Sequence, residues 1–199
     1  MRVALLDAAE ALISAGGPDS LSVRTLADEA GTTTRAVYSV FGSKEGLLAA
    51  LAQRAFEVLG ASISRLPVTD DPAGDLVEAS VRVFRAMAIE NPAAYRIMFL
   101  RIVPDLDVGA ATAAEAERSM NLLRERFGRL EAADGLGGRS VAEATFDFHA
   151  LCEGLATIEL RNPRLLGDDP ERAWRRAIAT LLSGLSVAPP EAHAPHDAE

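Results

Sequence analysis

The sequence predicts an all-α protein of about nine helices. Hydrophobic residues make up 49% of the 199 residues, which is ample for a packed core, whereas aromatic residues make up only 5%. Sheets favour β-branched and aromatic side chains, so a composition dominated by Ala and Leu favours helices. Apolar residues recur at helical spacing along the chain, and no alternating strand pattern competes with them.

Composition also narrows the setting in which the protein works. The single cysteine, Cys152, excludes an intrachain disulfide and fits a reducing compartment. No run of about 18 apolar residues is apparent, so we expect no membrane span and no membrane partner. Residues 1–13 lack the separate charged and apolar regions of a signal peptide. The expected location is therefore the cytoplasm.

The negative charge of the chain is concentrated away from one short stretch. The net charge is −9, but residues 57–199 hold 15 basic and 23 acidic residues, a balance of −8. Residues 30–44 hold two basic residues and no acidic one, although residues 1–56 as a whole are close to neutral. The stretch 30–44 is therefore the segment best suited to a polyanion.

Local signals predict four helices in the first third of the chain. An apolar stripe over residues 5–13 predicts the first helix, and glycine and proline at 16–18 end it. Ser22 is a good N-cap for a short second helix that ends at Gly31, where glycine suits a left-handed cap. The third helix follows a cap at Thr32 or Thr33 and ends near Phe41, and the fourth runs from the cap Ser43 to about Ser64.

Five further helices are expected after a break at residues 67–71. A proline in the first turn marks the starts at Asp71–Pro72, Asn91–Pro92 and Asp169–Pro170. The capping box Ser140-Val-Ala-Glu143 marks another start. The remaining helix is expected over about 108–133.

The most informative stretch is residues 22–44, SVRTLADEAGTTTRAVYSVFGSK. It is typical of two short helices joined by a tight turn, which is a helix-turn-helix whose second helix enters the DNA major groove. The second helix carries side chains that donate to phosphates or base edges: Thr33, Thr34, Arg35, Tyr38 and Ser39. Lys44 follows at the start of the next helix, where backbone N–H groups favour a phosphate.

Residues 5–51 resemble the DNA-binding domain of the TetR family of regulators. The resemblance is carried by Ala8-Ala9, Ser22-Val23-Arg24-Thr25-Leu26-Ala27, Ala30-Gly31, Tyr38, Phe41, Ser43-Lys44-Glu45 and Leu47-Leu48. It implies that Tyr38 and Lys44 hold phosphates with help from Thr33, that Thr34, Arg35 and Ser39 face base edges, and that Ser22 and Thr25 touch the DNA backbone. The alternatives are that Tyr38 is a packing residue and that Ser22 only caps its helix.

The chain from about Pro72 onward resembles the helical effector and dimerisation domain of the same family. Residues 91–99, NPAAYRIMF, resemble a segment of a C-terminal class named for a Trp-His-Gly pattern, and the matching positions are His149, Glu153 and Gly154, of which the glycine is shared. The expected organisation is a helix-turn-helix domain at 1–50 with a connecting helix at 43–64, a ligand-binding and dimerisation domain at 65–187, and a disordered tail at 188–199.

The helix over 141–162 is apolar on more than one side, which indicates two packing partners. We expect one partner to be the same helix of a second subunit, with the last helix completing a twofold four-helix interface. The expected interface residues are Phe148, Cys152, Leu155, Trp174, Ile178, Leu181 and Leu185. The alternative is a helix that packs only within its own chain.

An effector cavity is expected in the second domain. Its candidate lining residues are Phe84, Met87, Tyr95, Met98, Phe99, Phe127, Phe146 and His149. Met and Phe adapt to varied ligands and few charges lie nearby, so the expected ligand is an apolar or aromatic small molecule.

Together these features predict a transcription regulator, not an enzyme. We expect a homodimeric repressor that binds palindromic double-stranded operator DNA and is switched by a small-molecule effector. The three histidines lack zinc-site spacing, no nucleophile motif is present, and the glycines at 135–138 follow no strand, so we expect no metal and no cofactor. The remaining alternative is a helical small-molecule binding or adaptor protein that has lost DNA binding.

Overall fold

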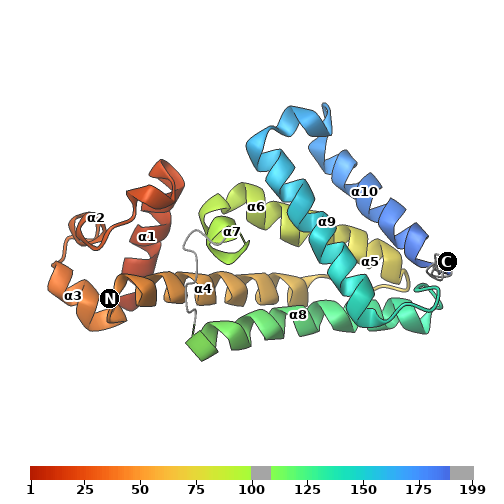
Figure 1. Cartoon of the computed structure of the whole chain (residues 1–199), viewed down its shortest axis with the longest axis horizontal. Coiled ribbons are helices and arrows are strands. Elements are labelled where there is room, and N and C mark those ends of the chain that lie inside the picture. The colour runs from red at the N-terminus through yellow and green to blue at the C-terminus, as the bar shows by residue number, and fades with distance from the viewer. Residues whose placement is uncertain (100–108, 189–199) are drawn as a thin grey trace, which may run out of the picture.

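The computed structural model describes residues 1–99 and 109–188, and within these ranges all regular structure is helical (Figure 1). This confirms the all-α prediction. Most of the predicted disordered tail, residues 189–199, lies outside the described residues.

The N-terminal part of the chain is a small helical head. It consists of α1 (Arg2–Gly16), the 3₁₀ turn η1 (Pro18–Ser20), α2 (Val23–Glu29), α3 (Thr34–Phe41) and the first half of α4 (Lys44–Arg65). Ser22, Thr33 and Ser43 cap α2, α3 and α4 by accepting a backbone N–H of the first turn, as predicted. The head cluster of buried residues comes from all four helices and includes Leu5, Leu26, Val37, Leu47 and Leu51.

The rest of the chain forms a larger helical body. Its elements are α5 (Pro72–Ala79), the π-helical segment η2 (Ser80–Arg85), α6 (Ala86–Glu90), α7 (Pro92–Phe99), α8 (Gly109–Ala132), α9 (Val141–Arg161), the 3₁₀ turn η3 (Pro163–Leu166) and α10 (Pro170–Leu185). The single helix predicted from residue 71 is thus α5, η2 and α6 in succession. Nothing in the apolar spacing indicated the π-helical segment.

The helix α4 belongs to both parts and packs along α8 (Figure 1). On length and mean hydropathy (1.3) alone, it is the one described helix that could cross a membrane. Its position is that of a core helix, because Leu47 and Leu51 are buried in the head and Leu59 and Ile63 in the body.

A buried arginine fixes the C-terminal end of α4. Arg126 of α8 donates from Nη2 to the carbonyl oxygens of Ile63 and Leu66, both at 2.9 Å, and from Nη1 to that of Pro67 at 3.2 Å. The last carbonyls of a helix lack partners within the helix, and a cation satisfies them well. Arg126 therefore holds the end of α4 against α8.

Aromatic rings and one buried acid connect the inner helices of the body. The Phe148 ring of α9 meets Phe84 at 5.6 Å and Phe127 at 5.5 Å between centroids, both edge to face. Glu159 of α9 accepts hydrogen bonds from Trp174 Nε1 at 2.8 Å and from Arg85 Nη2 at 2.8 Å. This shared acid ties η2, α9 and α10 into one unit.

Candidate nucleic-acid interface and effector cavity

The turn between α2 and α3 depends on a glycine. Gly31 has φ +62°, a left-handed conformation that residues with a Cβ rarely adopt. The Thr32 backbone N–H then donates to the Ala27 carbonyl at 2.8 Å, closing the turn over the buried Ala27. The chain folds back tightly here, so that α3 lies at the edge of the head (Figure 1).

One side of α3 is open to solvent and carries hydrogen-bonding groups. Thr33, Thr34, Arg35, Tyr38 and Ser39 are all exposed, and Lys44 is exposed at the first residue of α4. We call these six residues the reading face. Tyr38 is 50% exposed, so it is not a packing residue. On the opposite side of α3, Val37 is buried in the head cluster.

The hydroxyl groups near the reading face differ in whether their protons already have an acceptor. Thr33 Oγ1 accepts the Ala36 N–H at 3.2 Å, and its proton has no acceptor among the described residues. Thr25 Oγ1 instead donates to the carbonyls of Ser20 at 2.9 Å and Ser22 at 3.1 Å. Ser22 and Thr25 also cap each other. Thr33 is therefore free to donate to a phosphate, whereas Thr25 is committed to holding α2.

The cations of the reading face form no ion pair in the part of the chain that the structure describes, although the Lys44 charge acts on the neighbouring Glu45 carboxylate. Arg35 and Lys44 make no ion pair with any described residue. Beside Lys44, the backbone N–H of Glu45 and the Ser43 side chain lower the pKa of the Glu45 carboxyl, a sign that this helix start stabilises negative charge. Lys44 and the exposed N–H groups can thus hold a phosphate together.

A second candidate site is an apolar cavity of about 190 Å³ inside the body. Five elements line it: Phe56, Leu59 and Ile63 from α4, Phe84 from η2, Phe99 from α7, Ala116, Ser119, Met120 and Leu123 from α8, and His149 from α9. The rings of Phe84 and Phe99 face the His149 imidazole at 6.0 Å and 5.3 Å between centroids.

The titratable groups around the cavity are held neutral. Burial lowers the pKa of His149, although Glu153 acts in the opposite direction. Burial, reinforced by the Glu153 charge, raises the pKa of Tyr95 to about 12. Burial also raises the pKa of the Cys152 thiol well above its ordinary value, so this thiol is inert at neutral pH.

Two family models match the chain. Residues 5–51 match the model for bacterial regulatory proteins of the tetR family. Residues 77–181, more than half of the chain, match the tetracyclin repressor-like C-terminal domain. The chain belongs to the TetR family. It is therefore a DNA-binding transcription regulator with a helix-turn-helix, and the narrower likeness to the Trp-His-Gly class stays a prediction.

Solved structures share the fold over nearly the whole chain. A protein of unknown function from Rhodococcus sp. RHA1 is 24% identical with a TM-score of 0.80, over 93% of this chain and 95% of that one. The TetR family regulator PfmR from Thermus thermophilus is 25% identical with a TM-score of 0.67, over 91% and 98%. AibR, solved with isovaleryl coenzyme A and operator DNA, is 17% identical with a TM-score of 0.68, over 92% and 98%. No curated protein sequence matches significantly.

In this TetR family chain, three of the eight expected cavity residues line the apolar cavity: Phe84, Phe99 and His149. Phe146 was wrongly expected there, since it is 70% exposed on the outside of α9. Two positions along a helix is a rotation of about 200°, which puts Phe146 opposite the buried Phe148. The other expected residues lie elsewhere: Phe127 is fully buried in the core, Tyr95 packs behind Phe99, Met98 is half-buried, and Met87 lines a different cavity.

Sequence reasoning missed most of the cavity wall. It selected aromatic and Met residues by type, whereas α4 and α8 together supply seven of the lining residues. The available signal was the helical spacing of Phe56, Leu59 and Ile63, matched by Ala116, Ser119 and Leu123 on the helix that packs beside them.

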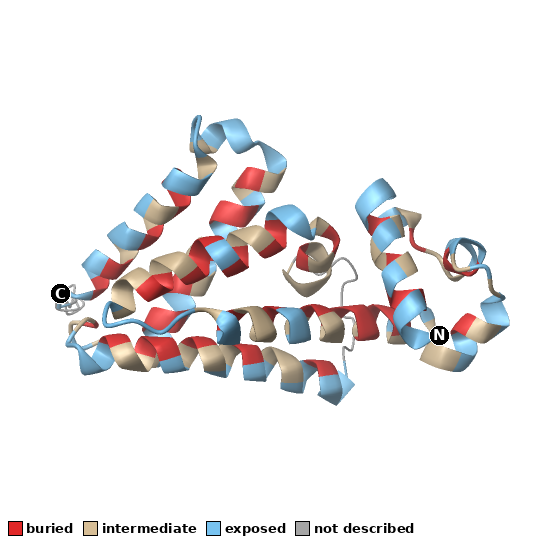
Figure 2. Ribbon diagram, turned by 180° about the vertical axis from the view of Figure 1, so that it is seen from behind, coloured by how far each residue is buried: buried red, intermediate tan, exposed pale blue. Residues whose placement is uncertain are grey.

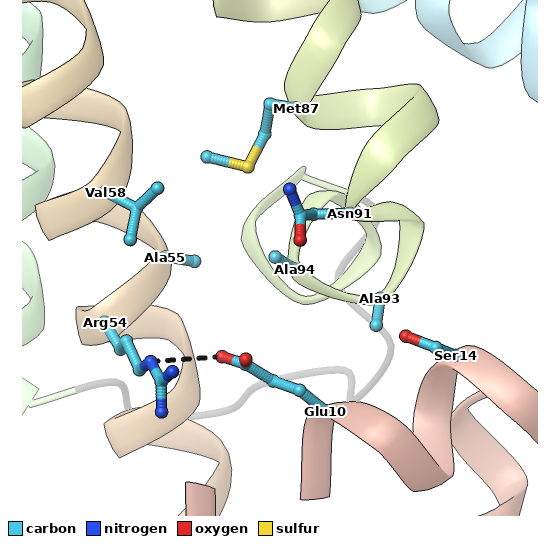
Figure 3. Close-up of a pocket in the computed structure, with 9 residues that line it drawn as sticks. All are labelled: Glu10, Ser14, Arg54, Ala55, Val58, Met87, Asn91, Ala93 and Ala94. Atoms are coloured by element: carbon cyan, nitrogen blue, oxygen red, sulfur yellow. Dashed lines mark ion pairs between the residues drawn. The ribbon is translucent and has the colours of Figure 1, made fainter. Parts of the chain in front are cut away.

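A smaller cavity of about 160 Å³ lies where the head meets the body (Figure 3). Arg54 of α4 points across it toward α1, with Nη1 2.6 Å from Asp7 Oδ1 and Nε 3.5 Å from Glu10 Oε1. Burial raises the pKa of Glu10, and Arg54 acts against this rise. Met87 and Ala93 complete the wall from the body side.

The helix α7 contacts both the head and the effector cavity. Ala93 and Ile97 pack on the head cluster, whereas Phe99, at the other end of α7, lines the effector cavity. The Tyr95 ring lies 5.1 Å from the Phe99 ring between centroids, tilted by 48°, and its hydroxyl donates to the Glu153 carbonyl at 3.4 Å. The short helix α7 therefore connects the cavity to the head.

The expected dimer residues face the inside of the chain. Phe148, Cys152, Leu155, Trp174, Ile178 and Leu185 are buried within the body cluster, and Leu181 is half-buried against it. A single chain already covers six of these side chains, so they have little surface left for a second subunit, whereas Leu181 keeps part of its surface exposed. The outer face of α10 is exposed instead (Figure 2), and α9 also carries exposed residues such as Phe146 and Ala150.

Proposed function

We propose that this chain is a ligand-responsive repressor that binds palindromic operator DNA as a homodimer and is released from it by a small apolar effector. The observation that carries the proposal is the reading face, which combines two cations, unpaired among the described residues, with free hydroxyl groups on a helix at the edge of the head. Thr34, Arg35 and Ser39 are assigned to base edges, and Thr33, Tyr38 and Lys44 to phosphates.

Ser22 is assigned to the DNA backbone as well, since it lies half-buried beside α3. Thr25 is assigned a positioning role, because its hydroxyl proton already serves the carbonyls that start α2. Its exposed methyl group and the exposed Arg24 on the same helix leave this side of α2 open to a DNA strand.

For the dimer we propose the outer faces of α9 and α10 in place of their inner faces. Five of the exposed residues of α9 form a stripe, namely Ala142, Phe146, Ala150, Gly154 and Thr157, and the acids Glu143 and Asp147 are exposed beside it. Small side chains allow two helices to approach closely, and Phe146 supplies a large apolar contact that one chain leaves in water. Two copies related by a twofold axis would present two heads to a palindrome.

For the effector we propose the apolar cavity. A ligand there touches α4, which enters the head, and Phe99 of α7, which packs on the head through Ala93 and Ile97. Occupancy of the cavity can thus change how the head sits on the body, and such coupling between sites is typically about 1–3 kcal/mol. AibR, with the same fold, holds both an acyl coenzyme A and operator DNA in its structure, which supports two kinds of ligand.

The test is selection of bound sequences from random DNA duplexes, followed by fluorescence anisotropy over a salt series. We expect an enriched palindrome and a steep salt dependence. Lys44→Ala should weaken binding on all sequences and reduce the salt slope by about one unit, and Tyr38→Phe should weaken binding. The matched control is Arg164→Ala, an exposed arginine of η3 far from the head, which should change neither quantity.

Equal affinity and equal salt slope in Lys44→Ala and wild type would refute the contact assignment. No binding at low salt, with or without candidate ligands, would instead favour a helical ligand-binding or adaptor protein. The net charge of −9 supports this alternative, because negative charge on a protein opposes binding to DNA.

A further inference from the structure

The effector cavity, which is partly open to the outside, has room for a single small ring. An apolar cavity of about 150 Å³ holds one benzene molecule. The cavity described here has about 190 Å³, so it is about 40 Å³ larger. One water molecule occupies about 30 Å³ in the liquid, so the extra space fits one substituent of that size on the ring.

The wall of the cavity suits an aromatic ligand. Phe56 and Phe99 lie edge to face with 6.2 Å between ring centroids, and Phe84 lies edge to face with His149. Both ring faces and ring edges are therefore available to a guest, and aromatic pairs favour such offset or perpendicular contacts. Apart from Ser119, the remaining described wall is apolar and consists of Leu59, Ile63, Ala116, Met120 and Leu123.

The serine in the wall offers only lone pairs to a ligand. Ser119 Oγ donates its one proton to backbone carbonyls, with Phe56 O at 2.9 Å and Glu115 O at 3.0 Å. Its side chain is buried, so no bulk water competes for this proton. Toward the cavity this hydroxyl can therefore act only as an acceptor.

The histidine in the wall is an acceptor for a different reason. His149 Nδ1 lies 3.4 Å from Glu153 Oε1, and this negative charge favours a proton on Nδ1. Burial lowers the pKa of His149, so the ring is neutral at neutral pH and Nε2 then carries a lone pair. No described residue bonds Nε2. Both polar side chains of the described wall thus accept and neither donates.

The described part of the wall disfavours a charged ligand. None of the ten described lining residues is Lys or Arg, so a carboxylate would enter without a counter-ion. The cavity between head and body differs in this respect, because Arg54 and Glu10 lie in its wall. The apolar cavity is therefore the one that selects a neutral molecule.

We propose that the effector cavity takes a neutral, single-ring molecule with one hydrogen-bond donor, of the size and chemistry of phenol. The proposal rests on the proposed function for its regulatory meaning, but the binding itself is tested without DNA. The donor of the ligand would reach His149 Nε2 or Ser119 Oγ, and the ring would fill the space between Phe56, Phe84 and Phe99.

The experiment is calorimetric titration of the full chain at neutral pH with four probes of similar size: phenol, toluene, methoxybenzene and benzoate. Phenol donates a hydrogen bond, toluene has no polar group, methoxybenzene only accepts, and benzoate is charged. We expect phenol to bind about three- to tenfold more tightly than toluene or methoxybenzene, which is the net effect of one hydrogen bond. Benzoate should not bind measurably.

Variants identify the groups responsible. His149→Leu should weaken the binding of phenol about three- to tenfold and leave the binding of toluene unchanged. His149→Gln, whose amide oxygen can still accept a hydrogen bond, should retain part of the preference for phenol. Ala116→Leu fills the cavity and should abolish binding of phenol and toluene alike. Circular dichroism of each variant checks the fold.

The proposal is overturned if toluene or methoxybenzene binds as tightly as phenol, if benzoate binds more tightly, if none of the probes binds, or if phenol binds folded His149→Leu as it binds wild type. Anisotropy on the same preparation separates the two proposals. A chain that binds phenol but no operator would refute the proposed function and uphold the ligand class of the cavity.

Discussion

Replacing Arg126 by methionine should strongly destabilise the protein. Arg126 is 7% exposed and donates to the carbonyls of Ile63, Leu66 and Pro67. Methionine keeps most of the aliphatic length and removes all three donors. The Ile63 position is buried, so its carbonyl keeps only the longer bond from the Leu66 backbone N–H at 3.3 Å, whereas Pro67 is exposed and its carbonyl can bond water instead.

The magnitude follows from these environments. The bond from the charged guanidinium to the buried Ile63 carbonyl contributes about 1.5–3 kcal/mol, and each of the other two bonds contributes about 1 kcal/mol. Burial lowers the pKa of Arg126, which shows that the charged form is disfavoured there, and the methionine variant is relieved of this cost. The expected loss is about 3 kcal/mol, or about 6–12 °C in Tm for a chain of this size.

The assay is urea denaturation and thermal melting followed by circular dichroism. Arg164→Met is the control, because Arg164 is exposed and makes no ion pair among the described residues, and it should stay within about 0.5 kcal/mol of wild type. Arg126→Lys should fall in between, since one ammonium group cannot reach all three carbonyls. A loss in Arg126→Met no larger than that of the control would refute the reasoning.

Three further changes test other parts of the structure. Phe146→Asp should leave the fold intact and weaken the proposed dimer at least about a hundredfold, because two apolar contacts become charged, as sedimentation would show. Gly137→Ala should lower the free energy of unfolding, measured by urea denaturation, by about 1–3 kcal/mol, since Gly137 has φ +55° and a Cβ would lie 2.7 Å from the Leu185 carbonyl oxygen. Asp75→Asn should lower the free energy of unfolding at neutral pH and should have almost no effect on it in strong acid. Burial opposes ionisation of Asp75, but bonds from Thr69 and Arg129 outweigh it and lower the pKa, so its stabilisation is full above the ordinary value of 3.8 and is lost as the pH falls through the lowered pKa.

Each of these tests has an outcome that contradicts it. A Phe146→Asp variant that stays dimeric would place the interface elsewhere. A Gly137→Ala variant as stable as wild type would mean that the loop before α9 can move away from the end of α10. A constant stability difference between Asp75→Asn and wild type across the acid range would remove the ionised carboxylate from the explanation.

The ends of the helices could be predicted because their causes are local. Ser22, Thr33, Ser43, Ser140 and Asp169 each accept a backbone N–H in the first turn of the helix that follows, and the sequence shows this pattern without any tertiary information. The reading face was predictable for the same reason. Its exposed side chains alternate with the buried Val37 on one short helix of simple periodicity.

The inner surfaces of the body could not be predicted in this way. The helix α9 carries Phe146 and Phe148 two positions apart, and both are equally apolar in the sequence. Which one faces inward is decided by its neighbours, where Phe84 and Phe127 meet Phe148 edge to face. The effector cavity likewise depends on how α4 lies beside α8. Periodicity describes one helix at a time and does not contain that pairing.

The anchored end of α4 turns this helix into a lever. Its fixed point is near Ile63, where Arg126 holds the last carbonyls, and the cavity touches it at Phe56, about 10 Å away at 1.5 Å per residue. Lys44 begins the same helix about 28 Å from the fixed point. A tilt that moves Phe56 by about 1 Å therefore moves Lys44 by about 3 Å, which is as long as a hydrogen bond. Under the proposed function, such a shift would take Lys44 out of reach of a phosphate, and it would also stretch the hydrogen bond from Thr112 Oγ1 to the Ala49 carbonyl that ties α4 to α8.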